Sequence, residues 1–168
     1  YHVRTSVAIT SIAIGGLQSS MVGITIPDTL SLINQATTVH VFVVRGIYTL
    51  TRAELEWYYQ FGVSEMFPDK WERFCAPIPP VERGDMMRAY HRLLTGPDEA
   101  RKIEAAKAWS LWEGETITLL PEPSTSDKFG EDDFALAFAR IENHFFVNAG
   151  WLDEGQLIRD AVKLRGIP

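Results

Sequence analysis

Apolar positions in the C-terminal three quarters of the chain recur at helical spacing, and turn residues separate them into short segments. Residues 51–54 (TRAE) have the spacing of a capping box, which predicts a helix through about Gln60 with Gly62 as its stop. Pro68 fits the first turn of a second helix, ahead of DKWERFC. Over 81–94 apolar residues recur at i, i+3/i+4 and i+7 spacing and predict one helix face, made of Met86, Met87, Tyr90, Leu93 and Leu94.

The same reasoning divides the remainder of the chain. We expect a helix over 97–113 that ends before Gly114, a polar loop over 121–130, and a helix from Glu131 to about Asn148. The apolar stripe of that helix is expected to be Phe134, Phe138, Ile141 and Phe145. A last helix is expected over roughly 153–165.

The N-terminal part of the chain has a different pattern. Segments 6–14, 21–26 and 39–44 are short and rich in β-branched residues, and VHVFVV at 39–44 is typical of a buried strand. Residues 5–27 carry no charge, so a membrane span and a signal peptide are alternatives. The many Ser and Thr residues, three glycines and Pro27 favour short strands over either alternative.

Charge follows the same division. The net charge of −6 argues against a nucleic-acid binder that relies on a basic face. Residues 1–44 hold only Arg4 and Asp28 as charged residues, so the chain changes character near Val44. The single cysteine, Cys75, excludes an internal disulfide and a cysteine-based zinc site, and it fits a reducing, cytoplasmic location.

Two glutamates are candidates for chemistry. Glu142 falls at the margin of the aromatic stripe of its predicted helix, and Glu113 closes a helix whose C-terminal dipole disfavours a carboxylate. Either residue could be an ordinary solvated or paired glutamate. Alternatively, each is a carboxylate held beside aromatic rings to receive a cation such as an ammonium group.

Recognisable catalytic motifs are missing from the sequence. No Walker A motif, metal-ligand histidine spacing or G-x-S-x-G nucleophile elbow occurs. Ser19 and Ser20, inside the stretch 16–23 (GLQSSMVG), are weak candidates for a nucleophile, and a plain loop role suits them better. We expect no metal and no cofactor.

From Val44 onward the sequence resembles the prolyl aminopeptidases (proline iminopeptidases), serine exopeptidases of the α/β-hydrolase fold. The resemblance rests on blocks over about 125 residues, and the two longest are the most specific. The blocks are RGIY (45–48), EWYYQ (56–60), FPDKWE (67–72), AAKAWSLWEGE (105–115) and FALAFARIENHFF (134–146).

This resemblance implies a substrate and a pocket. The substrate would be a peptide with an N-terminal proline, whose free amino group would bind Glu113 and Glu142. Tyr48, Tyr58 and Phe146 would line the pocket for the pyrrolidine ring. A cationic amine between two carboxylates, with aromatic walls around a small apolar ring, is physically coherent.

The resemblance also implies an architecture. We expect an α/β-hydrolase fragment, in which 48–168 form a mainly helical cap and 1–47 form a short β-rich part of the hydrolase core that matches the family poorly. The family's catalytic Asp and His follow its cap, so the chain is expected to be truncated and inactive as a peptidase by itself. The alternatives are a non-catalytic helical module that binds cationic N-termini or a protein partner, and a helical fragment without stable function.

Overall fold

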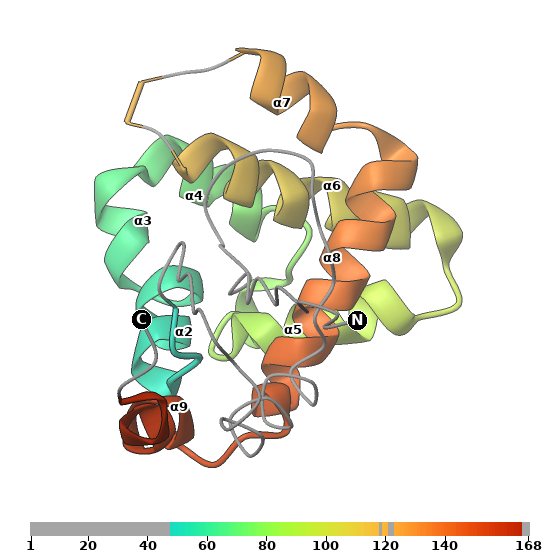
Figure 1. Ribbon diagram of the computed structural model, residues 1–168. Coiled ribbons are helices and arrows are strands. Elements are labelled where there is room, and N and C mark those ends of the chain that lie inside the picture. Colours follow the sequence, from blue (N-terminus) through green and yellow to red (C-terminus); the bar gives the residue numbers. More distant parts are fainter. Residues whose placement is uncertain (1–47, 118, 121–122, 166–168) are drawn as a thin grey trace, which may run out of the picture. The chain divides into compact units, whose positions relative to one another are not determined.

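The computed structural model describes residues 48–117, 119–120 and 123–165 (Figure 1). The strands expected over 6–14, 21–26 and 39–44 lie outside the described residues. Within them every regular element is helical, and no strand occurs. None of the helices in this part of the chain is long and apolar enough to cross a membrane.

The chain divides into two compact units. One is Leu50–Gly150, and the other combines Tyr1–Thr49 with Trp151–Pro168. In the second unit the expected helix over 153–165 is split into α9 (Gln156–Asp160) and a 3₁₀ turn (Ala161–Leu164). It starts late because Gly155, with φ 68°, adopts a left-handed conformation that does not fit a right-handed α-helix.

Within the unit Leu50–Gly150, the first helices begin as predicted. In α2 (Arg52–Tyr59) the capping box is confirmed: the Glu54 carboxylate accepts from the Thr51 backbone N–H at 2.9 Å, and the Thr51 hydroxyl accepts from Glu54 N–H at 3.4 Å. Gly62, expected as the stop of this helix, is instead the first residue of the next helix, α3 (Gly62–Met66). Pro68 is the first residue of α4 (Pro68–Cys75), as expected.

The next helix is shorter than predicted at its start. A 3₁₀ turn (Pro80–Glu82) precedes α5 (Met86–Thr95), because Asp85 caps the helix by accepting from Arg88 N–H at 3.0 Å. Of the expected face, Met86, Tyr90 and Leu94 are each at most 1% exposed, whereas Met87 and Leu93 are half-buried.

The prediction that a helix ends at Gly114 is wrong. Helix α6 (Glu99–Thr116) continues through this buried glycine. A Cβ atom at Gly114 would lie 2.6 Å from Cγ of Phe129, so glycine is needed there for close packing rather than for a helix end. Phe129 closes α7 (Pro123–Phe129), and this helix replaces the loop expected over 121–130.

Helix α8 (Asp132–Val147) has nearly the predicted bounds but buries another face. Ile141, expected in the apolar stripe, is 60% exposed. Phe134 and Phe138 are half-buried and pack against Phe129. Two of the buried residues, Ala135 and Ala139, are small and let α8 approach its neighbours closely. The full set of buried residues is Ala135, Ala139, Glu142, Asn143 and Phe146. A 3₁₀ turn (Ala149–Trp151) follows.

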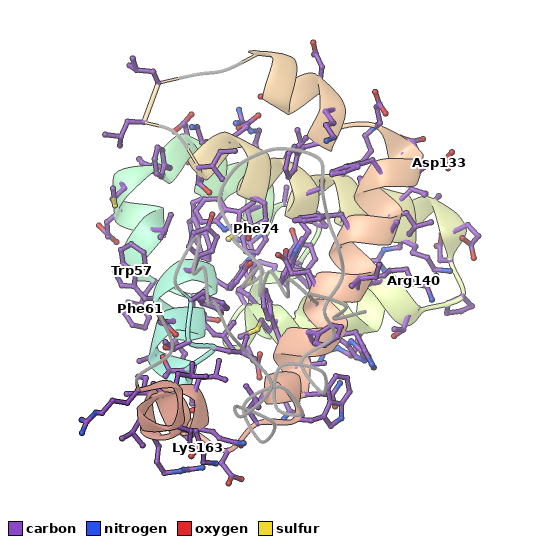
Figure 2. All side chains as sticks on the ribbon, viewed as in Figure 1. Trp57, Phe61, Phe74, Asp133, Arg140 and Lys163 are labelled. Atoms are coloured by element: carbon purple, nitrogen blue, oxygen red, sulfur yellow. The ribbon has the colours of Figure 1, made fainter. Side chains whose placement is uncertain are left out.

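Aromatic rings fill the interior of the unit Leu50–Gly150. Phe74 of α4 lies among them, as Figure 2 shows, with ring centroids 4.7 Å from Tyr90 and 5.2 Å from Trp112. Cys75 beside it is buried, and burial raises the pKa of its thiol. The core is therefore a rigid aromatic cluster contributed by several short helices.

Candidate functional site: two buried glutamates

Both candidate glutamates lie inside the helical unit. Glu113, in the last turn of α6, is 1% exposed, and Glu142, in the second half of α8, is 4% exposed. The reading of Glu113 as a solvated helix end is therefore wrong. Glu142 is one of the buried residues of α8.

The Glu113 carboxylate accepts hydrogen bonds from two neighbouring tyrosines of α2. The Tyr59 hydroxyl donates to Oε1, and the Tyr58 hydroxyl lies 3.4 Å from Oε2. Tyr58, which is only half-buried, also shares a hydrogen bond with the Thr116 hydroxyl. Both carboxylate oxygens of Glu113 thus have a phenol partner.

The Glu142 carboxylate is bonded on one side only. The Trp109 indole Nε1 donates to its Oε2 at 2.8 Å. Its Oε1 is buried and has no hydrogen-bond partner among the described residues. A buried carboxylate oxygen without a donor is costly, so this atom is available to a donor that comes with a ligand.

The donors to the two carboxylates are themselves in contact. The Tyr59 and Trp109 rings stack with centroids 4.6 Å apart and planes 12° from parallel. Phe146 lies beside both, 5.4 Å from Tyr59 and 6.3 Å from Trp109 between centroids. The structure thus brings four of the five expected substrate-binding residues together: Glu113, Glu142, Tyr58 and Phe146.

The fifth expected residue and the weak nucleophile candidates are not part of this picture. Tyr48 is half-buried and belongs to the other unit, so its place beside the two glutamates stays a prediction. Ser19 and Ser20 lie outside the described residues.

Burial makes both carboxyl groups hard to ionise. Desolvation raises the pKa of Glu142 from 4.5 to about 8, although the Trp109 indole opposes the rise. Desolvation, and next the charge of Glu142, raise the pKa of Glu113 well above its ordinary value, against the lowering effect of the two tyrosine hydroxyls. The charge of Glu142 therefore acts on Glu113.

Neither glutamate forms an ion pair with a basic side chain of the described residues. Nor do these residues contain a group of three or more His, Cys, Asp or Glu side chains that could hold a metal ion. Two adjacent buried carboxyl groups, surrounded by aromatic rings and without a counter-charge in this part of the chain, suit a small organic cation.

Sequence reasoning singled out the glutamates but missed the two side chains that hold them. Trp109 lies four residues before Glu113 and therefore on the same face of α6, and this spacing was the available signal. Tyr59 follows the predicted Tyr58 directly, and only the packing of α2 on α6 shows that both hydroxyls reach the same carboxylate.

No family model matches the chain. It is similar to the proline iminopeptidase of Xanthomonas citri, with 54% identity over 130 residues, which are 77% of this chain and 42% of that protein. A probable proline iminopeptidase of Leptolyngbya boryana is 49% identical over 127 residues, 75% of this chain and 40% of the relative. The Arabidopsis thaliana proline iminopeptidase is 42% identical over 127 residues, 74% of this chain and 33% of the relative.

The chain thus spans less than half the length of these curated relatives. The resemblance read from the sequence is confirmed over the matched segment. About three quarters of this chain is homologous to one segment of the proline iminopeptidases.

Proposed function

We propose that this chain provides the amine-recognition pocket of a prolyl aminopeptidase of the α/β-hydrolase fold, an enzyme that releases N-terminal proline from peptides. Its helical segment would be the cap of that enzyme, and Glu113 and Glu142 would bind the protonated amino group of the substrate. The observation that carries the proposal is the buried pair of carboxyl groups without a basic partner among the described residues.

The chemistry of the pocket favours this substrate class. The secondary amine of an N-terminal proline is cationic at neutral pH and offers N–H donors. Oε1 of Glu142 lacks such a donor among the described residues, and Phe146 and the Tyr58 ring provide apolar surface for a pyrrolidine ring. A blocked N-terminus has no charge to offer, so the pocket would make the enzyme an exopeptidase.

Ligand titration tests amine recognition directly. L-Prolinamide added to the chain is expected to change tryptophan fluorescence saturably, because Trp109 donates to Glu142. N-acetylprolinamide keeps the ring but lacks the charge, and should give no response. The double variant Glu113→Gln/Glu142→Gln should lose the response, whereas Glu115→Gln, near the same helix end, should keep it. A response unchanged in the double variant would contradict the proposal.

Hydrolysis is a separate part of the proposal. We propose that the chain binds the amine without turning over a proline–chromophore amide by itself, and the absence of a G-x-S-x-G motif supports this. The assay uses the purified chain, with Ser19→Ala and Ser20→Ala as variants. Turnover that either variant abolishes would overturn the inactivity and assign the nucleophile.

A further inference from the structure

Two donors of the aromatic core differ from the others in what they contact. Tyr59 and Trp109 each donate a hydrogen bond to one carboxylate of the glutamate pair. Tyr90 is equally buried, but its hydroxyl donates to the backbone carbonyl of Phe74, and the indole N–H of Trp112 has no partner among the described residues. The half-buried Tyr58 is a further donor, since its hydroxyl lies 3.4 Å from Oε2 of Glu113. Among the fully buried rings of the described core, Tyr59 and Trp109 are the two that donate to a carboxylate, so this contact is not a general property of the core.

These two donors connect three helices in a fixed order. Tyr59 of α2 bonds to Glu113 of α6, and Trp109 of α6 bonds to Glu142 of α8. Their rings stack at 4.6 Å, and each is at most 1% exposed, so neither ring can turn without displacing the other. The distance and orientation of the two carboxylates thus depend on one ring stack.

We propose that Tyr59 and Trp109 are positioning residues for amine recognition: their stacked rings hold the two carboxylates at a fixed spacing and leave Oε1 of Glu142 free for the ligand. This inference rests on the proposed function for its ligand. It goes beyond it by assigning a role to two side chains that would not touch the substrate's amine through their own polar atoms.

The hydrogen bonds predict the direction in which the pKa of each glutamate moves when its donor is removed. Each hydrogen bond stabilises the ionised form of its acceptor, and this lowers the pKa of Glu113 through Tyr59 and of Glu142 through Trp109. Loss of one donor should therefore raise the titration midpoint of its own partner. It should also let that carboxylate rotate, which weakens amine binding.

The variants remove one polar atom and keep a ring. Tyr59→Phe and Trp109→Phe delete the two donors, and Tyr90→Phe and Trp112→Phe are matched controls in the same core that donate to no carboxylate. Carboxyl ¹³C NMR on the free chain gives the glutamate titrations, and L-prolinamide titration gives affinity. Circular dichroism checks whether each variant is folded. If Trp109→Phe unfolds, Tyr59→Phe alone still tests the proposal.

We expect each donor variant to raise the titration midpoint of its own glutamate and to weaken prolinamide binding by about 10-fold or more. Both controls should bind within about twofold of the unsubstituted chain. Unmoved glutamate titrations, or donor variants that bind as well as the controls, would overturn the positioning role. Absence of binding by the unsubstituted chain would overturn the proposed function instead, and the NMR titrations would still decide the positioning role.

Discussion

Glu113 and Glu115 lie two residues apart near the end of α6, and their carboxylates have opposite surroundings. Glu115 forms an ion pair with Arg73 of α4, and its backbone carbonyl accepts from the Lys70 ammonium at 2.5 Å. Glu113 points into the core, where its partners are the hydroxyls of Tyr58 and Tyr59. Glu115 thus has basic partners, whereas the hydrogen-bond partners of Glu113 among the described residues are neutral hydroxyls.

The difference shows that two carboxyl groups can be buried with neutral hydrogen-bond donors as their partners and without a basic side chain of the described residues. An internal Arg or Lys would neutralise Glu113 and Glu142 permanently and compete with any ligand cation. Phenol and indole donors orient the carboxylates without cancelling their charge. On the surface, in contrast, acids pair directly with bases, as in Lys107–Asp132 at 2.9 Å. The interior pair has no basic partner among the described residues, which is what the proposed binding of an external cation requires.

The largest expected effect concerns the pH dependence of stability. The folded chain holds both carboxyl protons more tightly than the unfolded chain does, because burial raises both pKa values. The free energy of unfolding should therefore fall as pH rises from about 4.5 to about 8. The Glu142 shift alone corresponds to up to about 5 kcal/mol.

Urea unfolding at several pH values measures this effect. The double variant Glu113→Gln/Glu142→Gln should show a much flatter profile across that range, and Glu115→Gln should follow the unsubstituted chain. Equal profiles for all three proteins would mean that the two interior carboxyls titrate like surface groups, and the contrast between Glu113 and Glu115 would disappear.

The second prediction concerns Gly114, which lies between Glu113 and Glu115. Gly114→Ala places a methyl group 2.6 Å from the Phe129 ring, so α7 must move or the ring must shift. We expect a loss of roughly 1–3 kcal/mol in the free energy of unfolding. Gly84→Ala is the control, since a Cβ there meets nothing within 4 Å. A stability loss no larger than that of the control would show that α7 yields without cost.

The third prediction concerns the ligand. Because prolinamide binding favours ionised carboxylates, it should release protons, and affinity should rise with pH. With one proton released, the gain is about tenfold between pH 6 and 7, below the range where the ligand's own amine loses its charge. Calorimetry in two buffers of different ionisation enthalpy counts the protons. Affinity independent of pH would mean that the carboxylates are ionised before the ligand arrives.

The smallest effect is expected for the surface ion pair between Arg73 and Glu115. Arg73→Met keeps the aliphatic stem and removes the ion pair with Glu115, in which the arginine side chain is 59% exposed. We expect a change below about 1 kcal/mol in the free energy of unfolding, reduced further by salt. A loss of several kcal/mol would place Glu115 with the interior pair and not with the surface.

The helix starts were predictable because their signals are local. The capping box at Thr51 and the first-turn proline at Pro68 act within four residues, and both are confirmed. Gly114 misled because a glycine looks the same whether it ends a helix or admits a ring from another helix. Phe129, the ring in question, lies fifteen residues away in a segment expected to be a loop.

The site shows the same limit. An apolar stripe ranks Phe134 and Ile141 above alanine, but close helix contact rewards small residues, so α8 buries Ala135 and Ala139. Glu142 was recognisable from its neighbours and from family resemblance, although its nearly complete burial was not. That Tyr59 and Trp109 hold the carboxylates depends on contacts between three helices, which no single helical pattern contains.

The reactivity of Cys75 offers a way to measure local opening of this molecule. It is the only cysteine of the chain, it is 6% exposed at the end of α4, and it lies next to Phe74 in the aromatic core. We expect a thiol reagent to react with Cys75 when α4 separates from that core, so the labelling rate would report how often this opening occurs. A ligand that binds between Glu113 and Glu142 should lower the labelling rate of Cys75, and the more it stabilises the folded chain the larger this decrease should be.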